Sequence, residues 1–149
     1  MRLAVPGVTV GHWTDAVGQT GCTVIRLPEA TVASGEVRGG APASREFALL
    51  DPTRLVAAVD AVVLSGGSAF GLAAADGVMR ELAAEERGFP TANGPVPIVV
   101  ALALYDLGVG RADVFPDAEA GASAINAATD SPAMGRIGAG TGAMVGKWR

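Results

Sequence analysis

A strand, a glycine turn and a helix follow one another in the middle of the chain, and this order constrains the fold most. The run Ala61-Val62-Val63-Leu64 is continuously apolar, which predicts a strand over 60–65 that is buried on both faces. The helix expected after it extends to about residue 86 and carries Leu72, Ala75, Met79 and Leu82 on one face, with Asp76 and Arg80 paired outside. We therefore predict a mixed α/β (α+β) fold.

The turn between this strand and helix is Gly66-Gly67-Ser68. Free backbone amides at a helix N-terminus can bind an anion or an oxyanion, although Ser68 can equally act as a plain N-cap. Ser68 is not expected to be a hydrolase nucleophile, because the nucleophile elbow needs glycine where Phe70 stands. A Ser-His-Asp triad would also require His12, the single histidine, which we interpret as a structural residue in a strand.

Further elements follow from local patterns. We expect strands over 8–13, 23–27, 31–37 and 97–104, a loop over 38–42, and helices over 53–59 and 117–128. The first two strands should form an antiparallel pair around Gly18 and Gly21, and Asp51-Pro52 should begin the first of these helices. The second should pack closely through the small face Ala118, Gly121, Ala122 and Ile125.

The C-terminal segment sets Gly138, Gly140 and Gly142 near Lys147. Bare amides can approach a substrate closely, and a lysine can steer a carboxylate or share a proton with a nucleophile. A phosphate loop is excluded, since Thr141 and Trp148 stand where its pattern needs glycine and serine or threonine. The alternative is a glycine-rich strand with an exposed lysine. Tyr105, the single tyrosine, ends the strand over 97–104, where it faces either a cleft or the edge of the core.

Composition excludes several classes of function. A chain of 149 residues with 50 % hydrophobic and 17 % charged residues suits one globular domain, and a net charge of −4 offers no surface for nucleic acid. The uncharged run over 88–105 is broken by prolines, so no membrane span is expected, and the N-terminus has no apolar signal, which makes a cytoplasmic location the default. Cys22 and His12 are single, so we expect no disulfide, metal or cofactor.

Several motifs occur in a characteristic order along the chain. They are Arg38-Gly39-Gly40-Ala41-Pro42, Leu50-Asp51-Pro52, the run over 64–72, the run over 74–78, Pro97-Ile98-Val99, Tyr105-Asp106-Leu107, and Gly140-Thr141-Gly142 with Gly146-Lys147-Trp148. Over nearly the whole chain, this series resembles the P1 (S58, DmpA-like) peptidases. That family includes L-aminopeptidase/D-esterases, β-aminopeptidases and nylon-oligomer (6-aminohexanoate-oligomer) hydrolases. Val100-Ala101 and Arg136 depart from its pattern.

The resemblance implies a mechanism. Family members are precursors that cleave themselves, and the new N-terminal Ser or Thr of the β portion becomes the nucleophile, with its own α-amine as base. Neither that residue nor the downstream Asn of similar enzymes is present here. The catalytic positions carried over are Tyr105, which would hydrogen-bond substrate or oxyanion, and Lys147, which would assist proton transfer. Expected substrate-binding or oxyanion residues are Gly66, Gly67, Ser68, Phe70, Gly140 and Thr141.

The resemblance also implies the surrounding architecture. The family fold is a four-layer αββα sandwich of the N-terminal-nucleophile type, so residues 1–149 would be a single, incomplete α portion. The expected partners are the β portion of the same precursor and further copies in a tetramer or larger assembly. Three functions stay open: an amidohydrolase portion acting on peptides, β-peptides or nylon-type amides, an inactive remnant that binds or assembles, and an unrelated small-ligand domain.

Overall fold

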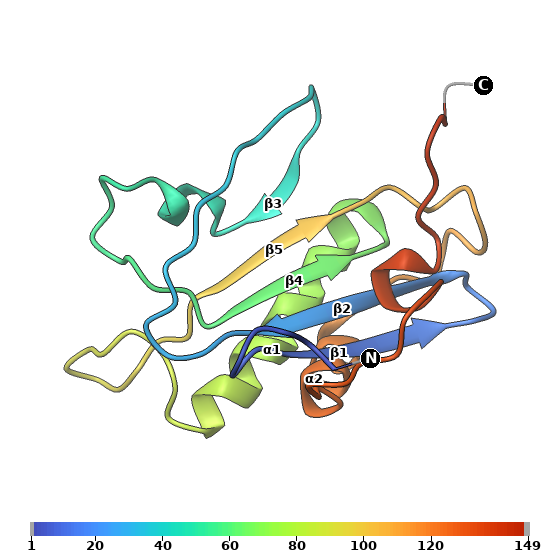
Figure 1. The fold of residues 1–149 in the computed structure, drawn as a ribbon. Helices are drawn as coiled ribbons and strands as arrows, with labels where there is room; N and C mark the ends of the chain where they lie inside the picture. The colour runs from blue at the N-terminus through green and yellow to red at the C-terminus, as the bar shows by residue number, and fades with distance from the viewer. Residues whose placement is uncertain (1, 148–149) are drawn as a thin grey trace.

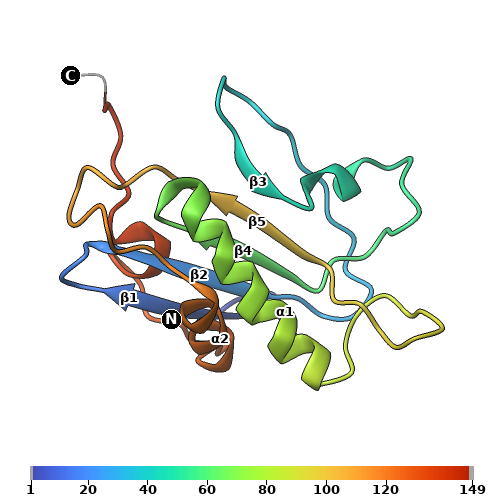
Figure 2. The ribbon, with the colours of Figure 1, turned by 180° about the vertical axis from the view of Figure 1, so that it is seen from behind.

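The computed structural model describes residues 2–147, which form one five-stranded sheet with two helices on one face (Figures 1 and 2). The strand order is β1-β2-β4-β5-β3. The strands are β1 (Thr9–Asp15), β2 (Thr20–Arg26), β3 (Ala43–Arg45), β4 (Ala61–Ser65) and β5 (Val99–Ala103), and the helices are α1 (Ala74–Ala84) and α2 (Ala118–Asn126). Three short 3₁₀ helices are η1 (Phe47–Leu50), η2 (Ser68–Ala73) and η3 (Gly138–Gly140). The mixed α/β prediction is therefore confirmed.

The N-terminal hairpin is as predicted. β1 and β2 pair antiparallel from Thr9 opposite Arg26 to Asp15 opposite Thr20. The Asp15 carboxylate accepts hydrogen bonds from the amides of Val17 and Gly18, which closes the turn.

A β-α-β crossover places the two central strands side by side. β4 and β5 are parallel neighbours joined through η2 and α1, and β2 and β3 flank them antiparallel. The carboxyl ends of β4 and β5 consequently lie at one edge of the sheet. The chain leaves β4 through Gly66 and leaves β5 through Leu104, so two segments about 40 residues apart in sequence meet there.

The main core lies between the sheet and the two helices, which cover the same face in Figure 2. Val24, Val63, Val78, Leu82 and Val99 are fully buried in it. The face predicted for α1 is confirmed at Ala75 and Leu82, with Leu72 and Met79 partly buried against the core.

Two details of the helices differ from the prediction. The buried residues of α2 are Ala120, Gly121, Ala124 and Ile125, so the predicted face is rotated, and Ala118 and Ala122 are half-buried at its side. The Asp76 carboxylate pairs with Arg45 of the edge strand at 2.5 Å and not with Arg80, because the strand supplies a guanidinium on the same side of α1.

The other face of the sheet is covered only at its ends. A second cluster, which includes Val59, Ile98 and Val100, packs under the connection between β2 and β4. At the opposite end η3 lies on β1 and β2, and Leu64 of β4 keeps 36 % of its surface exposed. The expectation that this strand is buried on both faces is therefore wrong, since burial alternates along it.

Two expected elements, and the strand considered as an alternative for the glycine segment, are absent from the described part of the chain. Residues 31–37 form a single bridge, Val32 to Ala58, instead of a strand. No helix forms over 53–59, because the Asp51 carboxylate accepts from both the amide and the hydroxyl of Thr53 and closes a local turn. The glycine segment is η3 followed by turns, not a strand. No helix within residues 2–147 is long and apolar enough to cross a membrane.

Candidate functional site

The site predicted from sequence lies at the carboxyl edge of β4 and β5, where parallel strands commonly present functional residues. The two chain segments are tied there by reciprocal backbone bonds: Leu104 N–H donates to Ser65 O at 2.8 Å, and Ser68 N–H donates to Leu104 O at 2.9 Å. These bonds place the Gly66-Gly67-Ser68 turn directly beside Tyr105.

The amides of this turn are already used within the chain. Gly66 N–H donates to Gly21 O at 2.8 Å, and Gly67 N–H donates to the Asp106 carboxylate at 2.6 Å. With Ser68 N–H bonded to Leu104, none of the three amides is free for an anion, contrary to expectation. Ser68 is not the N-cap either, because η2 has Gly67 as its N-cap and no side-chain cap bond. A role of the turn in substrate binding stays a prediction.

Backbone conformation at the turn explains part of its sequence. Gly67 has φ 78° and Ser68 has φ 56°, in the left-handed region. Glycine adopts such angles without steric cost, whereas a serine there stores strain that the surrounding hydrogen bonds must offset.

Asp106 lies at the centre of the site, and the sequence drew attention to it only as part of a motif. Asp106 is only 3 % exposed. Its carboxylate accepts hydrogen bonds from Gly67 N–H and, at 2.8 Å, from the Thr20 hydroxyl. Gly66 and Gly142 both abut the carboxylate, since a Cβ atom on either would fall inside 3.0 Å of an Asp106 oxygen. Its position after the single tyrosine at a strand end was the available signal.

The segment that carries Lys147 is docked on the hairpin through η3. Gly138 N–H donates to the Thr14 hydroxyl at 2.8 Å, and Ala139 N–H donates to the Thr23 hydroxyl at 3.1 Å. His12 Nδ1 lies 3.0 Å from the same Thr23 oxygen, while its Nε2 is buried without a partner in the described part of the chain. His12 thus has a structural position beneath η3, with only one ring nitrogen satisfied.

Lys147 and Tyr105 are brought together by this docking. Lys147 Nζ donates a hydrogen bond to the backbone carbonyl of Tyr105 and lies 5.7 Å from the centre of its ring, in reach of a cation–π interaction. Both residues are exposed and line one cavity of about 290 Å³, together with Asp106, Val109 and Met144. The two predicted catalytic residues therefore share a site, and their catalytic roles stay predictions. Trp148, the last residue of their motif, lies outside the described residues.

The other predicted site residues lie around this cavity and not in it. Phe70 is 60 % exposed and stacks on Phe115 with ring centres 4.9 Å apart. Gly140 lines a separate cavity of about 330 Å³ over the open sheet face, with Leu64, Leu102 and Leu104 among its walls. Thr141 is buried, and its hydroxyl has no partner within residues 2–147.

The free cysteine and the arrangement of possible metal ligands limit the chemistry available at the site. Burial raises the pKa of the Cys22 thiol to about 12, which keeps it a neutral core side chain and not a nucleophile. Among the described residues, no group of three or more His, Cys, Asp or Glu side chains is arranged to hold a metal ion.

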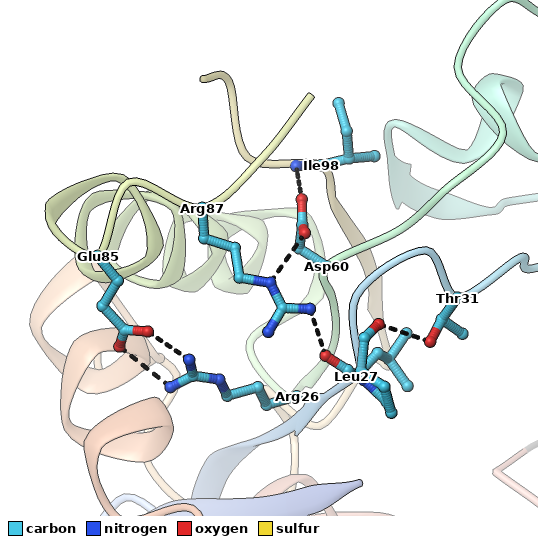
Figure 3. Close-up of polar contacts among 8 residues, drawn as sticks. Arg26, Leu27, Thr31, Asp60, Glu85, Arg87 and Ile98 are labelled. Carbon is cyan, nitrogen blue, oxygen red and sulfur yellow. Dashed lines mark hydrogen bonds and ion pairs between the residues drawn. The ribbon is translucent and has the colours of Figure 1, made fainter. Parts of the chain in front are cut away.

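The opposite edge of the sheet holds a second hydrogen-bonded carboxylate, that of the half-buried Asp60 (Figure 3). It accepts from Ile98 N–H at 2.8 Å and from Arg87 Nε at 3.3 Å, and the same guanidinium donates to Leu27 O at 2.6 Å. The pair borders a cavity of about 430 Å³, but its groups are directed at one another and at the backbone. Asp60 therefore ties the end of α1 to the start of β4 and β5.

Comparison with known proteins identifies the family. The model of peptidase family S58 matches residues 3–149. This chain belongs to that family. An uncharacterized aminopeptidase of Mycobacterium leprae is 44 % identical, and the match covers 95 % of this chain and 44 % of that protein. A 6-aminohexanoate-oligomer endohydrolase of a Kocuria species is 32 % identical, and the match covers 99 % of this chain and 39 % of that protein.

Structural comparison agrees at the level of the fold. The crystal structure of the PH0078 protein from Pyrococcus horikoshii superposes with a TM-score of 0.71 at 21 % identity, covering 93 % of the S58 chain and 43 % of that protein. The chain thus spans less than half the length of the relatives it matches.

Proposed function

We propose that this chain is the α portion of a self-cleaving amidohydrolase whose Ser or Thr nucleophile resides on a β portion. The observation that carries the proposal is the Tyr105–Lys147 pair, which lines an open cavity at the carboxyl edge of the parallel strands. Membership of a peptidase family and the names of the relatives, aminopeptidase and 6-aminohexanoate-oligomer endohydrolase, support amide bonds as the substrate class.

The side chains at the cavity suit this chemistry. An N-terminal nucleophile uses its own amine as base, so the chain must supply only charge stabilisation and orientation. The Lys147 ammonium, held at the Tyr105 carbonyl, would stabilise negative charge and assist proton transfer at the nucleophile. The Tyr105 hydroxyl would donate to the substrate or to the oxyanion of the tetrahedral intermediate.

The open sheet face supports the second half of the proposal. Leu64, Leu102 and Leu104 border a cavity whose far wall is formed by Ala139, Gly140 and Ala143, and Leu64 keeps 36 % of its surface exposed. We expect the β portion to lay a second sheet over this face, which would complete a four-layer αββα sandwich, and we expect the complete protein to form a tetramer or larger assembly. Sedimentation of the complete protein as a dilution-resistant monomer would contradict the assembly.

The test is maturation and turnover of the precursor in which a β portion follows this chain. Intact-mass analysis should find two polypeptides, the second beginning with Ser or Thr. Lys147→Ala should lower turnover of amino-acid p-nitroanilides or 6-aminohexanoate oligomers by about two to four orders of magnitude, typical of a positioned proton-transfer or charge-stabilising group. Tyr105→Phe should cost less, because one hydrogen bond is lost while the ring stays packed.

Arg111→Ala is the matched control. Arg111 is an exposed cation near the same edge, bonded through its backbone to Gly18 and through its side chain to Asp113. Its loss should leave maturation and turnover unchanged. If the Lys147→Ala protein matured and turned over substrate as the wild type does, the active site would not be at this cavity.

A further inference from the structure

We infer that Asp106 is a positioning residue for the proposed amidohydrolase, acting through the backbone that carries Tyr105 and Lys147. The inference rests on the proposed function for its catalytic meaning. Its structural basis is the meeting of four chain segments at one buried carboxylate.

The two carboxylate oxygens bind different segments. Oδ1 accepts from Gly67 N–H in the turn after β4, and Oδ2 accepts from the Thr20 hydroxyl at the start of β2. Thr20 is 2 % exposed, so this pair is closed to water. None of the ion pairs among the described residues includes Asp106. Burying a carboxyl group that has a backbone amide and a hydroxyl as its only partners among the described residues has a desolvation cost, which favours a role beyond packing.

Two glycines complete the junction: Gly66 is in the same turn as Gly67, and Gly142 adds the fourth segment. Gly66, at the end of β4, and Gly142, in the glycine segment, lie so close to Oδ2 that neither position can hold a Cβ atom without displacing the carboxylate or the backbone. The glycine at 142 thereby lets the C-terminal segment rest on Asp106 directly. This contact accounts for one of the alternating glycines that the sequence alone left unexplained.

The junction is linked to the candidate site at both ends. Asp106 follows Tyr105 in the chain, so holding its side chain also fixes the peptide whose carbonyl accepts from Lys147. Gly142 precedes Lys147 by five residues in the same segment. Loss of the carboxylate should let the two residues drift apart, and a displacement of about 1 Å in a catalytic group can cost about a hundredfold in rate.

The test is a set of variants of the complete protein. Asp106→Ala should lower kcat about a hundredfold and change KM only about threefold. Asp106→Asn retains one hydrogen-bond acceptor, so its kcat should be about tenfold higher than that of Asp106→Ala. Asp60→Ala is the matched control, because Asp60 is also a hydrogen-bonded carboxylate, half-buried, but lies at the opposite edge. It should lower stability and leave kcat unchanged. Wild-type kcat in folded Asp106→Ala, or an equal loss in Asp60→Ala, would overturn the inference.

Thr20 provides a gentler variant if Asp106→Ala does not fold or mature. Thr20→Val removes the hydroxyl donor at nearly constant volume, and Thr20→Ser keeps it. We expect kcat to fall in the valine variant and to recover in the serine variant. Equal kcat in the two would overturn the inference.

A readout independent of activity separates this inference from the proposed function. Amide hydrogen exchange at Gly67, followed by NMR, should become at least about tenfold faster in Asp106→Ala than in the wild type and stay unchanged in Asp60→Ala. If the wild type hydrolyses no amide, the proposed function fails while this readout still tests the junction. Unchanged exchange at Gly67 would refute the junction itself.

Discussion

Gly121→Ala is the substitution whose cost follows most directly from the packing of the two helices. Where the two helices cross, a Cβ atom added to Gly121 would lie 1.8 Å from the backbone oxygen of Ala74. Real Cβ atoms essentially never come closer than 3.0 Å to another heavy atom. Gly77 meets the Ala118 oxygen in the same way from the other helix. Since both obstacles are backbone, no side-chain rotation relieves them and the helices must separate.

The magnitude comes from two opposing terms. Alanine is favoured over glycine in a helix interior by about 1 kcal/mol. Overpacking a tight core costs about 1–3 kcal/mol, and a rigid backbone contact places this case at the upper end. Separation of the helices also loosens Val78, Leu82 and Ile125, which are buried between them and the sheet. We expect a net loss of about 2 kcal/mol in the free energy of unfolding.

Denaturant unfolding of the purified protein measures this loss. Gly40→Ala is the matched control, because nothing lies within 4 Å of the added Cβ atom there, and it should change stability by less than about 0.5 kcal/mol. The double variant Gly77→Ala/Gly121→Ala should cost less than the sum of the single variants, since one separation of the helices relieves both contacts. A Gly121→Ala protein as stable as the wild type would refute the close crossing.

Two further predictions concern the core and a helix end. Because burial raises the pKa of Cys22 from 9.0 to about 12, the unfolded state loses this proton first, so stability should fall between pH 9 and 12 with a slope approaching about 1.4 kcal/mol per pH unit. Cys22→Ala should remove this dependence of stability on pH, measured by denaturant unfolding at several pH values. An unchanged dependence in the variant would show that another group causes it. Asp117→Ala should lower the free energy of unfolding by about 1 kcal/mol, because it deletes the helix cap that accepts from Ala120 N–H. Glu119→Ala, at an exposed position of the same helix, is the control and should cost little. Equal losses in the two variants would contradict the capping role.

Local patterns in the sequence were sufficient for the elements that form the core. The apolar runs of β4 and β5 and the helical patterns of α1 and α2 each act over a few neighbouring residues, so they can be read without knowing the fold. Motif order was also sufficient to identify the family. Segments without such signals were predicted wrongly: residues 31–37 pair through only one bridge, and the helix expected after Asp51 is replaced by a local turn.

Only the tertiary structure decided how the site is assembled. Tyr105 and Lys147 are 42 residues apart, and they meet because β5 ends at the edge where η3 docks the C-terminal segment on β1 and β2. The amides of Gly66, Gly67 and Ser68 appeared free in the sequence, yet their acceptors belong to β2, to Asp106 and to the end of β5. The local signal at Asp106 was only its position after Tyr105 at a strand end, and it did not show which segments the carboxylate joins. The physical reason is that hydrogen bonds and close contacts between distant segments depend on strand order and register, which local residue preferences do not specify.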